Sequence, residues 1–128
     1  MAVDVKFLKQ IKYGAEVFGV EKTISCEQVI TYEESIPNAS TDLVKNISDI
    51  QLTNMILFAI SSDQTILVEY NDDAGAQGSF SLVANIPIVW ALACSQELNP
   101  VAATITSLYV TNTSGSAASL KIVAGYTI

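Results

Sequence analysis

The chain has no histidine and no arginine, and only 15% of its 128 residues are charged. Without histidine, the side chain that most often transfers protons near neutral pH is missing, which excludes Ser-His-Asp and Cys-His catalysis. The commonest metal ligand is missing too, and the lack of arginine argues against clamps for phosphate or carboxylate groups. We therefore expect a protein that is not an enzyme, with no catalytic residues, no cofactor and no metal site.

The charges that are present are mostly negative. All six cations are lysines, the net charge is −7 and the isoelectric point is near 4.2. This balance argues against nucleic-acid binding, which depends on cations that neutralise phosphates. An average domain has roughly 25% charged residues, and the cores of protein interfaces are depleted in charge. We therefore expect a homo-oligomer with part of its surface covered by neighbours, and a neutral monomer is the alternative.

Membrane and secretory signals are weak or missing. Residues 1–14 carry three lysines and no central apolar block, unlike a secretory signal. The longest apolar run, IPIVWALA at 86–93, is too short to span a bilayer. We expect no membrane partner and synthesis in a cytoplasm, where Cys26 and Cys94 would be reduced. Two buried thiols are favoured over a disulfide.

Apolar and polar residues alternate along most of the chain, which predicts β-strands. Near the start, the apolar residues of one parity are Val3, Val5, Phe7, Ile11 and Tyr13, with Lys9 as the exception. A helix through Leu8, Ile11 and Ala15 is a weaker reading of the same segment. A half-buried strand is expected over 24–32, whereas 35–48 is expected to be irregular, with one helical turn capped by Ser40, Thr41 and Asp42.

Strand character resumes at residue 50. The expected elements are strands at 50–60 and 66–70 joined by a hairpin turn at 61–64, a loop at 71–78, a strand at 80–84, a strand at 86–92 that is central or interfacial, and a final hairpin of 103–112 and 117–127 joined by TSGS. These are about eight or nine short strands with a turn every ten or so residues. The pattern predicts one domain over 1–128, an all-β, antiparallel β-sandwich that is jelly-roll-like.

The densest acidic cluster is a possible calcium site, because Ca²⁺ takes oxygen ligands. It consists of Glu69, Asn71, Asp72 and Asp73. The spacing does not fit an EF-hand loop, and the favoured interpretation is an exposed loop that uses aspartates for turn geometry. Glu33 and Glu34 resemble a glycosidase carboxylate pair, but neighbours on a strand point to opposite faces, so we expect a charged strand end.

Aromatic side chains are a second kind of candidate site, because exposed aromatics can stack on sugar rings. They are Trp90 and the tyrosines Tyr13, Tyr32, Tyr70, Tyr109 and Tyr126. Most share the parity of neighbouring aliphatic residues, which predicts core packing. Tyr109 is the exception, since it shares a mixed face with Ile105, Ser107 and Thr111 that could form a contact surface.

The final segment, ITSLYVTNTSGSAASLKIVAGYTI, resembles the C-terminal hairpins of small virion proteins from tailed bacteriophages. In these, a strand of the type L-x-V-x-N leads through a Ser/Gly turn into a strand of small and aliphatic residues. The wider character is similar to head decoration, or cement, proteins, which are β-rich, often trimeric and located on the capsid exterior.

The resemblance implies a non-enzymatic protein of the virion, with a homotrimer and the major capsid protein as partners. We expect residues 3–13 and 105–128 to contribute to contacts. The alternatives are another phage component, such as a head fibre, tail or baseplate protein, and a carbohydrate-binding β-sandwich.

Overall fold

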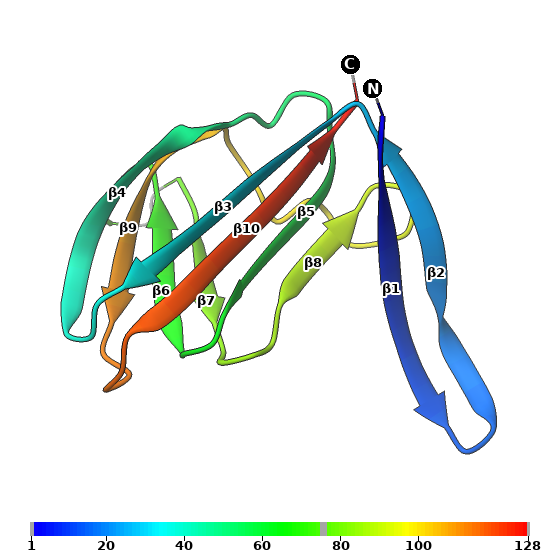
Figure 1. Cartoon of the computed structure of the whole chain (residues 1–128), viewed down its shortest axis with the longest axis horizontal. Coiled ribbons are helices and arrows are strands. Elements are labelled where there is room, and N and C mark those ends of the chain that lie inside the picture. Colours follow the sequence, from blue (N-terminus) through cyan, green and yellow to red (C-terminus); the bar gives the residue numbers. More distant parts are fainter. Residues whose placement is uncertain (1, 75–76, 128) are drawn as a thin grey trace.

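The computed structural model describes residues 2–74 and 77–127, which form ten β-strands (Figure 1). The strands are β1 (Val3–Tyr13), β2 (Glu16–Cys26), β3 (Gln28–Ile36), β4 (Ser40–Ile50), β5 (Met55–Ser62), β6 (Ile66–Tyr70), β7 (Ser79–Leu82), β8 (Ile88–Ala91), β9 (Ile105–Asn112) and β10 (Ala118–Tyr126). Every strand pair is antiparallel. No helix in the described part of the chain is long and apolar enough to cross a membrane.

Strands β3 to β10 form a sandwich of two four-stranded sheets. The strand order is β3-β10-β5-β8 in one sheet and β4-β9-β6-β7 in the other. Consecutive strands lie in different sheets at every step except β6 to β7. This is the strand order of a jelly roll, in which eight strands form two Greek keys. The predicted all-β, antiparallel sandwich is confirmed.

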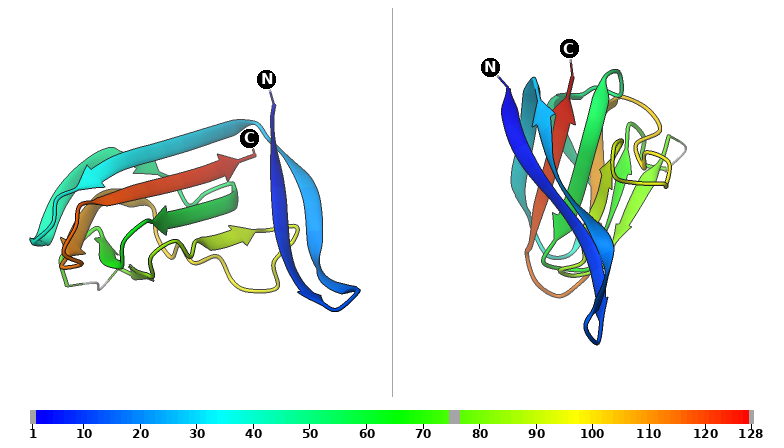
Figure 2. Two further views of the ribbon diagram at one scale, coloured as in Figure 1. Left: turned by 60° about the horizontal axis from the view of Figure 1, so that its bottom comes forward. Right: turned by 90° about the vertical axis from the view of Figure 1, so that its right-hand side faces the viewer.

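Strands β1 and β2 form a separate two-stranded sheet that we call the arm, residues 3–26. Their ladder runs without interruption from the Val3–Cys26 pair to the Tyr13–Glu16 pair. The two-residue turn between them needs a positive φ, which Gly14 supplies at 61°. The arm stands at one end of the sandwich and extends well beyond it (Figures 1 and 2).

The sandwich core lies between the two sheets and follows the alternation of the strands. Its fully buried side chains include Ile36, Phe58, Ile60, Val68, Tyr70, Leu82, Leu108, Val110 and Leu120. Phe80 stacks on Phe58 and on Tyr70, with ring centroids 5.5 Å and 5.3 Å apart. Because every second side chain points inward, these strands bury one face and leave the other for solvent or for a further layer.

Asn112 ties two corners of the sandwich together, and its side chain is fully buried. Its amide nitrogen donates to the carbonyls of Ile36 at 3.1 Å, Pro37 at 3.2 Å and Ser116 at 2.9 Å. Its amide oxygen accepts from the backbone and hydroxyl of Ser114. One side chain thus joins the β3–β4 corner to the β9–β10 connection.

Two predicted hairpins are wrong. The turns at 61–64 and TSGS exist, but β5 and β6 lie in different sheets, as do β9 and β10. In a jelly roll such turns carry the chain across the core, so the strands beside them in space come from far away in the sequence. β10 pairs with β3 and β5, and β9 pairs with β4 and β6.

The predicted irregular segment at 35–48 is also wrong, because β4 occupies 40–50. Pro37 and Asn38 mark only the corner between two strands, and Ala39 has a positive φ of 63°. Asp42 has a φ of 48°, and the register shifts between Ser40 and Leu43. The residues expected to cap a helical turn therefore form a bulged strand.

Two further predictions concern 71–92. The expected strand at 86–92 shortens to β8, which lies at a sheet edge and not in its centre, although its outer side chains Val89 and Ala91 pack with residues of the arm. The expected loop at 71–78 includes residues 75 and 76, which lie outside the described residues.

Candidate interaction surface

The arm has one mainly apolar face and one mainly polar face, because its strands alternate. The apolar face carries Val3, Val5, Phe7, Ile11 and Tyr13 of β1 and Phe18, Val20, Ile24 and Cys26 of β2, which the register brings together. The polar face carries Asp4, Lys6, Gln10, Lys12, Glu21, Thr23 and Ser25, with Leu8 and Val17 as its apolar members. The predicted face of β1 is therefore correct, and the helix through Leu8 and Ile11 is excluded.

The inner half of the apolar face packs on the outer face of the β3-β10-β5-β8 sheet. Phe7, Ile24 and Cys26 are buried there against Leu57 of β5 and Ala91 of β8. Half-buried residues complete this cluster: Val5, Val20, Val29, Ile56, Val89, Cys94 and Val123. The base of the arm thus covers one end of the sheet as a third layer.

Gly125 of β10 makes this close packing possible. A Cβ atom at this position would lie 2.7 Å from Sγ of Cys26 and 2.7 Å from Cγ of Leu57. These separations are too short for carbon contacts, so any larger residue would push the arm base away. The missing side chain lets Cys26 rest directly over β10.

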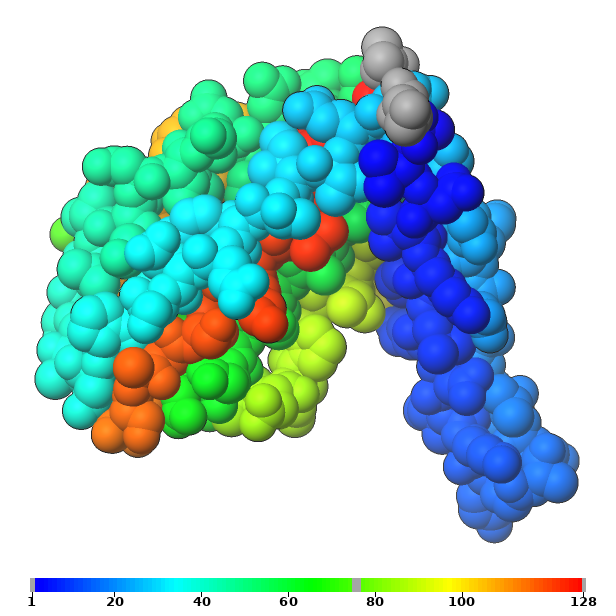
Figure 3. Space-filling view, in the orientation of Figure 1, coloured from blue at the N-terminus to red at the C-terminus, as the bar shows by residue number. Residues whose placement is uncertain are grey.

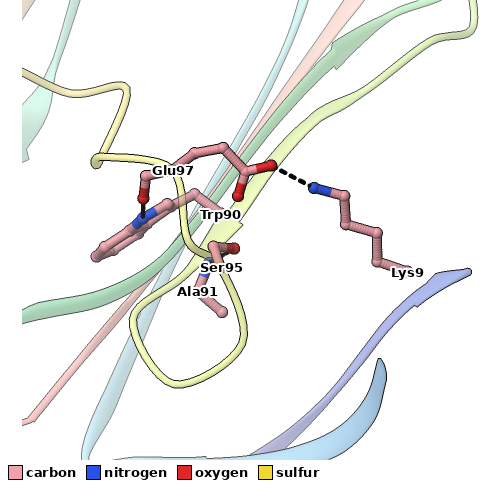
Figure 4. Close-up of polar contacts among 5 residues, drawn as sticks. All are labelled: Lys9, Trp90, Ala91, Ser95 and Glu97. Atoms are coloured by element: carbon pink, nitrogen blue, oxygen red, sulfur yellow. Dashed lines mark hydrogen bonds and ion pairs between the residues drawn. The ribbon is translucent and has the colours of Figure 1, made fainter. Parts of the chain in front are cut away.

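An ion pair fixes the middle of the arm to the loop after β8. Nζ of Lys9 lies 2.7 Å from Oε1 of Glu97, and the hydrogen bond and charge of Lys9 lower the pKa of the Glu97 carboxyl. The carbonyl of Glu97 accepts a 3.0 Å bond from the indole nitrogen of buried Trp90 (Figure 4). The backbone amides of Cys94 and Ser95 donate to the Ala91 carbonyl, which closes the turn. Lys9 therefore binds a loop that is itself anchored in the core.

Beyond Lys9 the apolar face is mostly exposed, and Ile11 and Phe18 line only a hollow beside Cys94, Gln96 and Glu97 of the loop after β8. We call residues 11–18 the arm tip. Ile11 is 72% exposed, Tyr13 79% and Phe18 60%. In the space-filling view the outer half of the arm stands clear of the sandwich (Figure 3). Six of the eleven large apolar side chains exposed among the described residues belong to the arm. Three of these six, Ile11, Tyr13 and Phe18, lie together on one face of the tip, and such contiguous apolar exposure is typical of an interaction site.

An apolar groove lies between the arm and the sheet it packs on, with a volume of about 240 Å³. Ala59 of β5 lies at its centre, between its register partners Val89 of β8 and Val123 of β10. Phe7 and Leu8 of the arm line the opposite side. The far end of the same sheet face is polar, with Ser61 beside Lys121.

Sequence reasoning missed part of this surface. It did not predict strand structure over 16–23, so Phe18 was not recognised as a surface residue. It also predicted core packing for Tyr13, which is wrong because no layer covers this end of the arm. The available signals were the glycine after Tyr13 and the alternation of Phe18, Val20 and Ile24 on a single face.

Among the residues that the structure describes, the other aromatic side chains form no exposed row on the sandwich. Trp90, Tyr70 and Tyr126 are buried, which confirms the predicted core packing, and Tyr32 is half-buried. Tyr109 is half-buried on the outer face of the β4-β9-β6-β7 sheet, opposite Glu69. Ile105, expected on the same face as Tyr109, is instead buried in the core.

The acidic cluster is held together by structural hydrogen bonds. The Asn71 side chain donates to the Thr104 carbonyl at 2.8 Å and accepts from the Thr106 amide at 2.8 Å. Asp72 accepts a 2.9 Å bond from the backbone of Ala74, the turn geometry expected of an aspartate. Within the described ranges, no three His, Cys, Asp or Glu side chains are placed to hold a metal ion.

Glu69 is the one buried acid of this cluster, 9% exposed. Burial raises the pKa of its carboxyl, and the charge and hydrogen bond of Asp42 raise it further, followed by the charges of Asp73 and Asp72. Glu33 and Glu34 each have a lysine partner, Lys121 at 3.9 Å and Lys45 at 3.3 Å. The two glutamates do not face a common site.

Both cysteines are free thiols, with Cys26 buried and Cys94 half-buried. Both pack in the cluster under the arm base. Burial raises the pKa of the Cys26 thiol, with a smaller contribution from Asp4. They behave as small apolar residues of this contact.

No family model matches the chain, and no curated protein matches it. A solved structure described as "Bacillus endospore appendages form a novel family of disulfide-linked pili" contains a chain that aligns with 78% of this one. The alignment covers 88% of that chain, with a TM-score of 0.35 and 8% sequence identity. A similarity at this level carries no argument about function.

Proposed function

We propose that the chain is a non-enzymatic structural protein of a virion, a capsid decoration protein of tailed bacteriophages that stabilises the assembled head. The observation that carries the proposal is the arm, whose apolar face continues past its own sandwich and exposes Ile11, Tyr13 and Phe18. Exposing three large apolar side chains to water is unfavourable for a monomer. In an assembly, the same side chains can be buried against a neighbouring subunit.

Two further features support this role. Jelly rolls are common in viral capsid proteins, though also in lectins and cupins, so the fold raises the expectation without deciding it. The net charge of −7 suits a protein that should not bind released DNA. The C-terminal resemblance to small virion proteins adds the same expectation from sequence.

The mechanism is mass action. A protein that binds the assembled shell and not its free subunits shifts the equilibrium toward the shell, by RT ln(1 + [L]/Kd) for each site. Each copy contributes contacts only, and a self-associating trimer would bridge several subunits at once. Neither role needs a catalytic pocket.

Co-sedimentation tests this function. The purified chain is mixed with undecorated capsid shells of a tailed bacteriophage, and in parallel with the unassembled major capsid protein. We expect saturable binding to the shells, little binding to the free subunits, and a higher temperature of shell disruption after binding. If the shells of the phage that encodes this chain do not bind it, the proposal is contradicted.

A further inference from the structure

We propose that the arm tip of one copy docks into the apolar groove of a second copy, with Phe18 and Ile11 seated against Ala59, Val89 and Val123. This inference rests on the proposed role as a structural subunit, and it names the two surfaces that meet. The partner is therefore another copy of this chain.

The first argument is continuity of the apolar face. Phe7, Ile24 and Cys26 are already buried on a sheet, and Ile11 and Phe18 continue the same face of the same two strands. A two-stranded ribbon alone is only marginally stable in water. The base of the arm is covered by the apolar outer face of a sheet, and the same kind of surface on another molecule would cover the tip.

The groove offers such a face. Ala59 is small and flanked by two valines, so the floor of the groove is apolar and leaves room between the valines for another side chain. Its volume of about 240 Å³ is below the roughly 300–1,000 Å³ of small-molecule sites. A groove of this size suits one or two side chains better than a ligand.

The arm cannot fill its own groove with its tip. The arm base lines the groove through Phe7 and Leu8, and the tip points away from the sandwich (Figure 3). Only another molecule can bring a tip to this site. Such a contact joins two different surfaces, and it closes into a ring when the rotation between copies allows.

The net charges of the arm and the sandwich favour a copy of this chain as the occupant. Residues 3–26 hold four of the six lysines and three of the thirteen acidic residues, a net charge of +1. The remainder of the chain therefore carries −8. The arm as a whole is weakly positive and the sandwich strongly negative, so long-range attraction favours contact between arm and sandwich over contact between two sandwich bodies. The tip itself carries one lysine and one glutamate, so its contact in the groove is apolar.

Complementation between two defective variants tests the contact. Phe18→Asp disables the tip, and Ala59→Glu fills the groove without removing a packed side chain. The matched controls are Val17→Asp, on the opposite face of the arm, and Ser61→Glu, two residues further along the same sheet face. Thermal unfolding by circular dichroism checks that each variant folds, and Phe18→Ser and Ala59→Gln replace any that do not.

Sedimentation velocity with two distinguishable fluorophores gives the readout. We expect each defective variant to weaken self-association at least about tenfold, while both controls associate like the unmodified chain. Mixing the two variants should yield a heterodimer, since one intact tip meets one intact groove. A groove variant that associates normally, or a mixture that forms no heterodimer, overturns the inference.

Disulfide trapping gives an independent measurement. In a Cys94→Ser background, a Glu16→Cys protein, which keeps Ile11 and Phe18 and carries its thiol on the same face of the arm, is mixed with an Ala59→Cys protein under mild oxidation. We expect a cross-linked pair between unlike molecules, and much less with Ser61→Cys. Dominant Glu16→Cys homodimers would place the tips against each other and overturn the inference.

The two proposals fail in different ways. If the chain self-associates through tip and groove but never binds shells, the virion function fails and the docking stands. If the chain binds shells but is monomeric at 100-fold the concentration used there, the docking fails and the function stands.

Discussion

Ile11 and Phe18 lie opposite each other in the ladder of the arm, and both are more than half exposed. Facing apolar residues on one side of a hairpin normally mark the side that packs on a core. Here the same face is buried at the arm base and bare at the tip. The exposed pair is therefore the natural place to separate the effects of interaction from those of folding.

Replacing both residues by threonine should remove the apolar surface without harming the fold. Because the tip contributes little to the core, we expect the free energy of unfolding of Ile11→Thr/Phe18→Thr to change by no more than about 0.5 kcal/mol. Binding of the dye ANS in dilute solution should fall clearly. Val44→Thr, an exposed position of the sandwich, is the control. A large loss of stability would show that the tip is part of the core.

Gly125→Ala should loosen the arm base. The added methyl group would clash with Cys26 and Leu57, and overpacking of this kind typically costs about 1–3 kcal/mol. Chemical denaturation measures the loss, and limited proteolysis should cut within residues 3–26 faster than in the unmodified chain. Ser61→Ala, on the same sheet face away from the arm, should change neither. Unchanged proteolysis of the arm would contradict this explanation of Gly125.

Asn112→Asp should destabilise the sandwich strongly. The substitution keeps the shape but replaces the nitrogen that donates to three carbonyls by an oxygen that repels them. We expect a loss of about 3 kcal/mol or more in the free energy of unfolding. Exposed Asn46→Asp should cost no more than about 0.5 kcal/mol. If the two substitutions lower the free energy of unfolding equally, Asn112 does not stabilise the link between the two corners.

Glu69→Gln should alter the pH dependence of stability. The folded-state pKa of Glu69 is raised above its ordinary value of 4.5, so the folded chain holds this proton more tightly than the unfolded chain does. The resulting stabilisation is present below pH 4.5 and is lost as the pH rises through the folded-state pKa. The variant should therefore gain stability relative to the unmodified chain between pH 4 and pH 7. Denaturant melts at both pH values measure this gain, and a constant difference would contradict it.

The predictable part of the fold was set by alternation and turn residues. Val3, Val5 and Phe7 share a face as expected, and the TSGS segment is a turn. Neither signal indicates which layer covers a strand face or which strand pairs alongside it. Alternation looks the same whether a face is covered, as at Phe7, or bare, as at Tyr13. Turn chemistry bends the chain in the same way whether the next strand pairs alongside or crosses to the other sheet.

The arm tip and the groove are formed by contacts that are remote in sequence. Ala59, Val89 and Val123 gather because β8 and β10 flank β5, and no local pattern specifies those neighbours. The concentration of lysines in the first 22 residues is apparent from the sequence, which also predicts that residues 3–13 make contacts. The sequence does not indicate that residues 3–13 belong to a hairpin that extends beyond the two packed sheets.

The position of β10 also constrains the order of events during synthesis. This last strand lies between β3 and β5, so neither of them has its inner neighbour until residues 118–126 have left the ribosome. The arm, by contrast, consists of adjacent segments and can form as soon as residue 26 has emerged, since local pairings form fastest. A nascent chain thus exposes the apolar face of a formed arm while the sheet that the arm packs on still lacks β10. Chaperone protection during translation should therefore be needed at this stage more than at any later one.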